Sequence, residues 1–228
     1  MRGSVYILIS FCILLIGCNS KDAEPNLQTR TIAKIKPEFK QKQWMWIRHE
    51  RGVSEDELQA KFNNLRDHGF TGVLIGGDHE VMFNAAHNAG LEAHIWMWTL
   101  NRGDEELMQN HPDWYSVNRN GTSCHEDPPY VGYYRWLCPT KDSVRLFLAN
   151  QVDEYCRKSY IDGIHLDYVR YCDVILPSAL WEKYGLVQDH EMPEFDYCYC
   201  ETCRNKHKSV TGLDPLTFEN PAKDYDWR

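Results

Sequence analysis

A histidine and an aspartate stand two residues apart in the apolar stretch DGIHLDYVRY, residues 162–171. An unpaired charge that is removed from water costs several kcal/mol, so a buried strand normally avoids such groups. The pair is therefore expected either to line a solvent-filled site or to form an internal ion pair. In a site, His165 and Asp167 could move protons or stabilise a developing positive charge. In the alternative, Asp167 pairs with Arg170 or Arg48.

The alternation of side chains along a strand predicts where these two residues point. Residues two apart face the same side, so His165 and Asp167 share one face while Ile164 and Leu166 share the other. In a barrel of parallel strands, one face packs on the outer helices and the other points to the axis, which opens into the active site at the C-terminal end. We therefore predict that His165 and Asp167 point inward, with Asp167 near the mouth.

Strand and helix signals alternate from residue 43 onward. The predicted strands are 43–49, 70–77, 91–100 and 162–169. Between them, Ser54 and Glu57 form a capping box, Gly69 and Gly90 end two helices, and Thr140 caps the helix before the fourth strand. This order predicts an α/β protein, a partial (β/α)8 TIM barrel of about four βα units with long insertions after strands 3 and 4.

Polar and aromatic residues gather where the predicted strands end. Because the carboxyl ends of parallel strands meet at one edge of a sheet, these residues form one predicted substrate-binding site. Its members are Trp46, Arg48, His49, Asp78, His94, Trp96, Trp98, Asn101, His165 and Arg170. Tryptophan offers a flat apolar surface on which a sugar ring can stack. A single Trp on a strand is more often part of the core, so this prediction depends on several converging at one end.

The composition limits the classes of ligand that the chain can bind. Its formal net charge of -8 argues against nucleic acid, because binding to phosphates needs a basic surface. No G-x-G-x-x-G motif follows the first strand and no P-loop occurs, so a nucleotide site has no support. We predict no cofactor.

The stretch DGIHLDYVRY, together with HNAGLEAHIWMWTLNR and HPDWYSVNRNG, resembles glycoside hydrolase-like family 10, bacterial barrel proteins that are often lipoproteins. The resemblance covers residues 43–171, about four of the eight units of a barrel. It implies a TIM barrel that hydrolyses glycosidic bonds, with Asp167 as a catalytic carboxylate. Such hydrolysis ordinarily uses one ionised and one protonated carboxyl group. The second is expected from a later strand, with Glu50 and Asp78 as lower-ranked substitutes.

The N-terminal sequence predicts where in the cell the protein is located. Residues 1–17 have the pattern of a lipoprotein signal peptide, and the sequence LIGC makes Cys18 the predicted lipidation site. Residues 18–42 then form a lipidated tether and 43–228 an incomplete barrel; a retained N-terminal membrane anchor is the alternative. We expect a lipid-anchored protein of the bacterial cell envelope, at the outer membrane. Because a complete barrel takes about 250 residues, the chain is expected to be a truncated product or a fragment, or else the remaining units come from elsewhere.

The chain has nine cysteines, several of them close in sequence. A predicted thiol cluster consists of Cys172, Cys198, Cys200 and Cys203. Such a cluster can hold a structural zinc ion or form disulfides, and the sequence leaves both open. Cys124 and Cys138 bracket an insertion and could form a disulfide, whereas Cys156 is predicted on the apolar face of its helix.

Three functions fit these patterns. The first is a glycoside hydrolase that acts on a polysaccharide or oligosaccharide at the cell envelope. The second is a noncatalytic glycan-binding surface lipoprotein, which a truncated barrel would favour. The third is a metal-dependent hydrolase that uses Asp78, His79 and His94, although no compact histidine spacing supports it.

Overall fold

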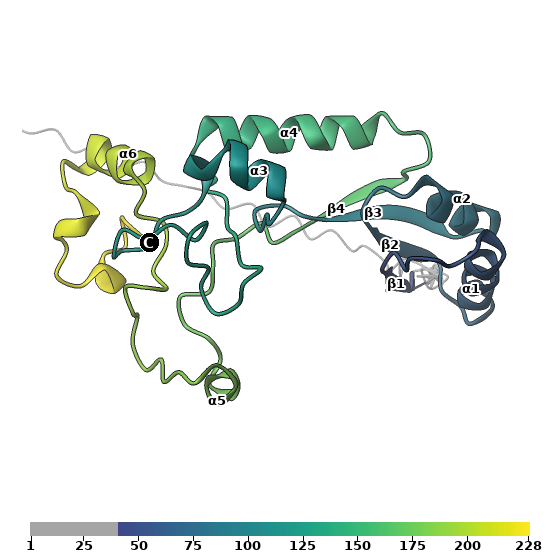
Figure 1. Ribbon diagram of the computed structural model, residues 1–228, viewed down its shortest axis with the longest axis horizontal. Coiled ribbons are helices and arrows are strands. Elements are labelled where there is room, and N and C mark those ends of the chain that lie inside the picture. The colour runs from purple at the N-terminus through teal and green to yellow at the C-terminus, as the bar shows by residue number, and fades with distance from the viewer. Residues whose placement is uncertain (1–40) are drawn as a thin grey trace, which may run out of the picture. The chain divides into compact units, whose positions relative to one another are not determined.

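Four parallel strands pair in sequential order within residues 41–228, the part of the chain that the computed structural model describes (Figure 1). The strands are β1 (Trp44–Ile47), β2 (Gly72–Gly76), β3 (Glu92–Trp98) and β4 (Gly163–Asp167). Sequential parallel order requires a crossover between each pair, as in a (β/α)8 barrel. The predicted fold class, a partial barrel of four units, is confirmed. Cys18, the signal peptide and most of the tether lie outside the described residues.

Helices connect the strands. They are α1 (Glu55–Asp67), α2 (Glu80–Asn88) and, before β4, α4 (Asp142–Cys156). The predicted capping box is present, because the Glu57 N–H donates to Ser54 Oγ at 3.3 Å and the Ser54 N–H donates to the Glu57 carboxylate at 2.9 Å. Gly69 and Gly90 follow α1 and α2 at φ values of 89° and 77°, which only glycine adopts without strain.

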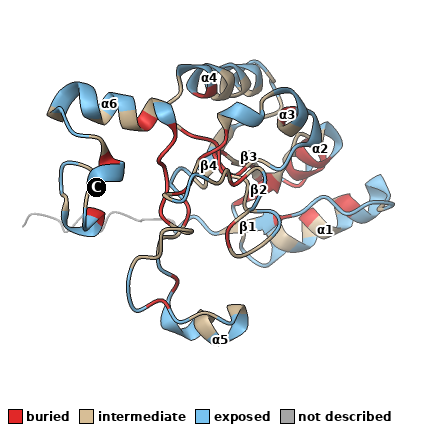
Figure 2. Ribbon diagram, turned by 60° about the vertical axis from the view of Figure 1, so that its left-hand side comes forward, coloured by how far each residue is buried: buried red, intermediate tan, exposed pale blue. Residues whose placement is uncertain are grey.

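One face of the sheet packs on α1 and α2 and forms the first core. Val73, Ile75 and Ile95 from the strands meet Phe62 and Phe83 from the helices, and all five are fully buried. Burial of such side chains contributes about 1.5–3 kcal/mol each. Figure 2 shows the buried residues along the strands and on α2. The opposite face is the inner face of the partial barrel.

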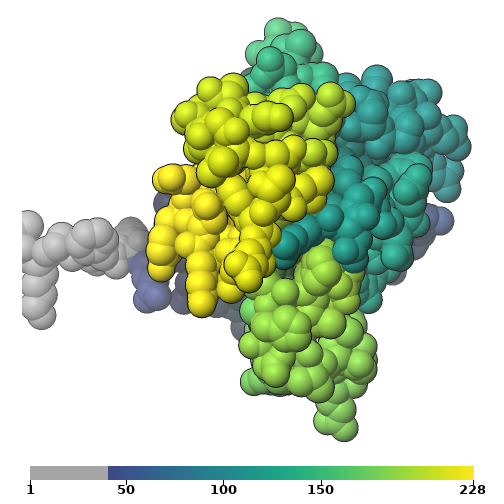
Figure 3. Space-filling model, turned by 90° about the vertical axis from the view of Figure 1, so that its left-hand side faces the viewer, coloured from purple at the N-terminus to yellow at the C-terminus, as the bar shows by residue number. Residues whose placement is uncertain are grey.

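The two insertions share a second core. It contains α3 (Glu105–Asn110) after β3 and α6 (Glu201–Thr211) after β4. The Tyr199 N–H donates to Val117 O at 2.7 Å, and Asn118 forms an isolated antiparallel β-bridge with Tyr197. The two segments therefore pair through their backbones. Figure 3 shows the last part of the chain packed beside the insertion that follows β3. The remaining short elements are α5 (Trp181–Tyr184) and the 3-10 turns Pro112–Trp114, Ser178–Leu180, Pro215–Thr217 and Pro221–Lys223.

Two predictions about these elements are wrong. The N-cap of α4 is Lys141, so Thr140 does not cap it. Cys156 is exposed at the end of α4, whereas the sequence predicts it on the apolar face of that helix. Of this apolar face, Val144 is buried and the other apolar side chains are half-buried. The last residues of the chain include two 3-10 turns, each of which begins with a proline. Among the described helices, none has the length and apolar character needed to cross a membrane.

Candidate functional site

The inner face of the sheet presents the predicted site in layers. From the N-terminal to the C-terminal end of the sheet, pairing aligns Trp44–Gly72–Glu92, then Trp46–Leu74–His94–Gly163, then Gly76–Trp96–His165, and last Trp98–Asp167. His165 and Asp167 therefore share the inner face, as the alternation predicts. Asp167 lies in the last layer, at the end of the strands where barrel enzymes bind their substrates.

An aromatic row crosses this face toward Asp167. We define it as Trp46, Trp96, Trp98, Tyr133 and Tyr168. The ring centroids of Trp46 and Trp96 are 6.3 Å apart, those of Trp96 and Trp98 6.1 Å, and Trp98 lies 5.0 Å from Tyr168 and 5.9 Å from Tyr133. Trp46 is 67% exposed. Trp96, Trp98 and Tyr168 are half-buried and Tyr133 is exposed, and a continuous row of such rings is suited to stacking against the apolar faces of successive sugar rings.

A hollow of about 500 Å³ lies where β2 and β3 end. Trp96, Trp98 and Tyr133 line it, and Asp104 contributes a carboxylate whose side chain is 56% exposed. Its volume falls within the range of about 300–1,000 Å³ that is typical of small-molecule sites. Asp167 does not line the hollow, but it pairs in register with Trp98, which does.

A polar network occupies the N-terminal half of the inner face. Lys42 Nζ donates to Glu92 Oε2 at 2.6 Å, His94 Nε2 lies 2.9 Å from Glu92 Oε1, and His94 Nδ1 lies 2.9 Å from His165 Nε2. A neutral His94 that donates to Glu92 can accept the proton of His165, which satisfies all three groups. Partial burial, together with the neighbouring His94, lowers the pKa of His165.

Asp167 is half-buried and accepts its hydrogen bond from the backbone. The Tyr168 N–H donates to Asp167 Oδ1 at 2.7 Å. Tyr168 has a φ of 55°, in the left-handed region that a tyrosine rarely occupies. Such strain is concentrated at functional sites, where the surrounding structure holds it. This strained turn directly follows the predicted catalytic residue and brings the Tyr168 ring back onto Trp98.

The ion pair considered as the alternative for Asp167 is not formed among the described residues. Arg170 instead pairs with Asp173 at 3.1 Å, and its guanidinium lies 5.0 Å from the Trp136 ring and 5.3 Å from the Tyr168 ring. The alternative in which Arg170 pairs with Asp167 is therefore not the one that the structure shows. Arg48 is exposed beyond the end of β1.

Two other predicted binding residues are held by structural contacts. Asp78 accepts from Tyr160 Oη at 2.7 Å and from Lys158 Nζ. Although partial burial acts to raise it, the pKa of Asp78 is lowered, because these two donors stabilise the carboxylate. Asn101 is 1% exposed, and its Oδ1 accepts from the Arg135 N–H at 2.8 Å. Both residues thus connect elements of the fold.

Neither lower-ranked carboxylate stands free to act with Asp167. Glu50 pairs with Lys61 of α1 at 2.7 Å, and Asp78 is held as described above. The His49 ring stacks on His79 at a centroid distance of 3.9 Å. Within residues 41–228, Asp78, His79 and His94 do not converge as metal ligands, which leaves the metal-hydrolase alternative without a site.

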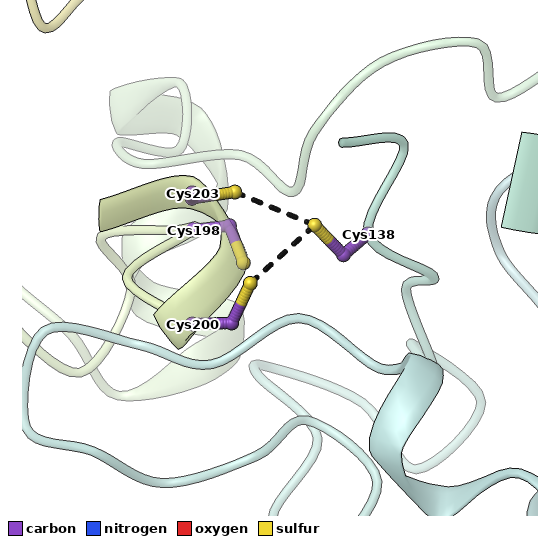
Figure 4. Close-up of side chains that lie close together, drawn as sticks. All are labelled: Cys138, Cys198, Cys200 and Cys203. Atoms are coloured by element: carbon purple, nitrogen blue, oxygen red, sulfur yellow. Dashed lines mark hydrogen bonds between the residues drawn. The ribbon is translucent and has the colours of Figure 1, made fainter. Parts of the chain in front are cut away.

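The thiol cluster differs from the prediction in one member. It consists of Cys138, Cys198, Cys200 and Cys203, so the inclusion of Cys172 is wrong (Figure 4). The predicted Cys124–Cys138 disulfide is also wrong, because the Cys124 thiol lies against the backbone of Trp136, whose N–H donates to its sulfur at 3.2 Å. Burial raises the pKa of Cys124 to about 12.

Two residues of the aromatic row were not predicted. Tyr133 comes from the insertion after β3, in a segment without regular periodicity, and only the tertiary structure brings it to Trp98. Alternation along β4 predicts that Tyr168 faces the helices with Ile164 and Leu166. The strand ends at Asp167, and the positive φ of Tyr168 turns its ring toward Trp98 instead.

Comparison with solved structures finds several glycoside hydrolases. The chain is similar to the galactosidase domain of an α-galactosidase–sucrose kinase, with 13% identity and a TM-score of 0.43 over 57% of this chain and 21% of that one. It is also similar to a noncanonic maltogenic α-amylase from Thermotoga neapolitana, with 14% identity and a TM-score of 0.44 over 64% and 42% of the two chains. An α-galactosidase from Thermus thermophilus, solved with stachyose, aligns at 15% identity and a TM-score of 0.41 over 55% and 32%.

These alignments do not establish a function for the chain. The chain covers less than half the length of each of those three structures, and TM-scores below 0.5 at such identities support no transfer of activity. No family model matches the chain, and no curated protein does. The resemblance to glycoside hydrolase-like family 10 therefore stays a prediction, and function must be argued from the inner face itself.

Proposed function

We propose that this chain is a carbohydrate-active barrel protein that binds a polysaccharide or oligosaccharide along the aromatic row. In this proposal, Asp167 is one of the two carboxyl groups of a glycoside hydrolase. The observation that carries it is the alignment of Trp98 with Asp167 in the last layer of the inner face, at the end of the row. A sugar stacked there would present its glycosidic bond near a carboxylate.

In this proposal, Asp167 takes the role of the ionised partner. Its Oδ1 accepts the Tyr168 N–H at 2.7 Å, which orients the carboxylate at the end of β4. An ionised carboxylate stabilises the positive charge that develops on the sugar ring, or attacks it as a nucleophile. The proton for the leaving group must come from a second carboxyl group, which we expect from a later strand of the barrel.

A second candidate function is glycan binding without hydrolysis. It is favoured by the engagement of Glu50 with Lys61 and of Asp78 with Lys158, because neither carboxylate is then free to donate a proton opposite Asp167. The aromatic row would then act as a binding platform alone.

Measurement of glycan binding and of reducing-end release separates the two functions. If a second carboxyl group is supplied, the wild type cleaves a bound glycan, whereas Asp167→Asn binds it with cleavage reduced at least about a hundredfold; without that group, the wild type binds and does not cleave. Asp153→Asn, which removes an exposed carboxylate on α4, is the matched control and should retain full activity. Binding without cleavage by the wild type supports the second function. Cleavage that Asp167→Asn leaves unchanged contradicts the assignment of Asp167.

We also propose that Cys18 carries a lipid that anchors the protein to the cell envelope, at the outer membrane. The support is the LIGC sequence alone. Cys18→Ser should move the protein from the membrane fraction to the soluble fraction. Retention of the variant in the membrane fraction would favour an uncleaved N-terminal anchor instead.

A further inference from the structure

Four cysteines from two distant segments converge in the second core (Figure 4). Cys138 belongs to the insertion after β3, whereas Cys198, Cys200 and Cys203 lie at the start of α6. All four are buried, with exposed fractions between 0% and 7%. Such convergence needs an explanation, because burial of apolar surface alone does not require four sulfurs at one point.

The sulfur positions fit a metal site better than a disulfide. Cys138 Sγ lies 3.4 Å from Cys203 Sγ and 3.6 Å from Cys200 Sγ, and all four sulfurs lie within 4.8 Å of one another. A disulfide brings two sulfurs to about 2.05 Å and leaves no role for the other pair. Four thiolates around one zinc ion, each about 2.3 Å from it, lie about 3.8 Å apart at the corners of a tetrahedron.

Hydrogen-bond donors and a helix N-terminus lie next to the sulfurs. The Val117 N–H donates to Cys198 Sγ at 3.4 Å. Cys200 is the N-cap of α6, an 11-residue helix, so the cluster lies at the N-terminal end of the helix dipole. Lys141 Nζ lies 3.4 Å from Thr202 Oγ1, between Cys200 and Cys203 in the sequence, and so brings a positive charge to the same loop. Outer partners of this kind orient and stabilise the thiolate ligands of metal sites.

Access to the cluster is provided by a neighbouring hollow of about 890 Å³, which Cys198 and Cys203 line together with Tyr171 and Tyr197. A metal ion could therefore reach the sulfurs after the chain has folded. The same hollow could admit a chelator, which makes the site open to experiment.

We propose that Cys138, Cys198, Cys200 and Cys203 bind one zinc ion in a tetrahedral structural site. Each thiol loses its proton to solvent on binding, and four sulfur–zinc bonds form without any change in oxidation state. Four protein ligands close the site to substrate, as in structural rather than catalytic zinc centres. The ion would join the insertion after β3 to the start of α6. Its ligand Cys138 lies two residues after Trp136, and Tyr168 and Arg170 pack against the Trp136 ring.

Elemental analysis of the full chain, purified without chelators, tests this proposal. We expect one zinc ion per chain in the wild type. Cys138→Ser should reduce bound zinc at least about tenfold, since even the outer partners of zinc ligands contribute that much. Cys172→Ser and Cys156→Ser are the matched controls and should retain zinc, because Cys172 lies outside the cluster and Cys156 is exposed.

A second measurement on the wild type covers the case in which Cys138→Ser fails to fold. Exchange of zinc for Co²⁺ should give the intense visible bands of a tetrahedral metal together with sulfur-to-metal charge transfer. The proposal is overturned by a chain that carries no metal, whether its mass shows disulfides or free thiols. It is also overturned by iron in place of zinc, or by loss of zinc in Cys172→Ser with retention in Cys138→Ser.

Discussion

The imidazole of His94 lies directly over Gly163 of the neighbouring strand. The two residues pair in register, and a Cβ atom built on Gly163 would lie 2.6 Å from His94 Cε1 and 2.8 Å from Nδ1. Only glycine leaves room for the ring to cross β4 and reach His165 Nε2. Trp44 lies over Gly72 in the same way, with its ring 2.5 Å from the Cβ position. Two glycines thus let large rings lie flat on the inner face.

We expect Gly163→Ala to destabilise the protein by about 1–3 kcal/mol, because the added methyl group overpacks the site and displaces His94. Urea denaturation measures the change in the free energy of unfolding. Gly132→Ala is the control, since a Cβ there meets nothing within 4 Å, and it should be close to neutral. Equal stability of the two variants would show that His94 does not occupy the place described above.

The His94–His165 contact predicts a pH dependence of stability. The pKa of His165 is lowered from 6.5 by partial burial and by His94, so the unfolded chain binds more protons than the folded one between the two pKa values. Stability is therefore full above about pH 6.5 and falls as the pH drops toward the lowered pKa. In His165→Gln, the urea concentration at the unfolding midpoint should change less with pH than in the wild type over this range. A profile of His165→Gln that follows the wild type would contradict the prediction.

His68→Gln provides the control for loss of a histidine, because His68 is exposed at the end of α1, away from the inner face. Its pH profile should match that of the wild type. The comparison is best made above about pH 5, where carboxylates stay ionised in both the folded and the unfolded chain.

Asp78 is expected to matter more for stability than for glycan binding. Its carboxylate joins the end of β2 to the connection between α4 and β4 through Lys158 and Tyr160. Asp78→Asn should cost about 1 kcal/mol, because it weakens the hydrogen bonds from Lys158 and Tyr160 while Lys158 keeps its second partner, Glu154, at 3.3 Å. Tyr160→Phe removes one hydrogen bond and should cost about 0.5–1.5 kcal/mol. Loss of glycan binding by a stably folded Asp78→Asn variant would restore this residue to the binding site.

Local signals in the sequence predicted the frame of the fold well. The capping box at Ser54 and Glu57 and the helix ends at Gly69 and Gly90 depend only on neighbouring residues. They can therefore be predicted without knowledge of the tertiary structure. The alternation of β4 likewise placed His165 and Asp167 on one face. Such features are fixed by the backbone geometry of a single element.

Contacts between distant segments could not be derived in this way. Cys138 joins three cysteines some sixty residues later, and nothing in the spacing distinguishes it from Cys172. An Arg170–Asp167 ion pair was one alternative from the sequence, but Arg170 instead pairs with Asp173, three residues along the chain, and lies over the Trp136 ring as a cation–π contact. The folded insertions decide these pairings.

The aromatic row makes a direct prediction for glycan binding, and Trp46 is the residue best suited to test it. Trp46 is 67% exposed, so Trp46→Ala removes a stacking surface with little loss of core packing. Loss of one sugar-stacking ring should weaken binding about tenfold, equivalent to about 1.4 kcal/mol, while the unfolding midpoint stays near that of the wild type. Tyr225→Ala, which removes an aromatic ring that is 92% exposed and lies outside the row, should leave affinity unchanged. Calorimetric titration with an oligosaccharide measures both variants, and equal affinities would mean that the glycan does not extend over Trp46.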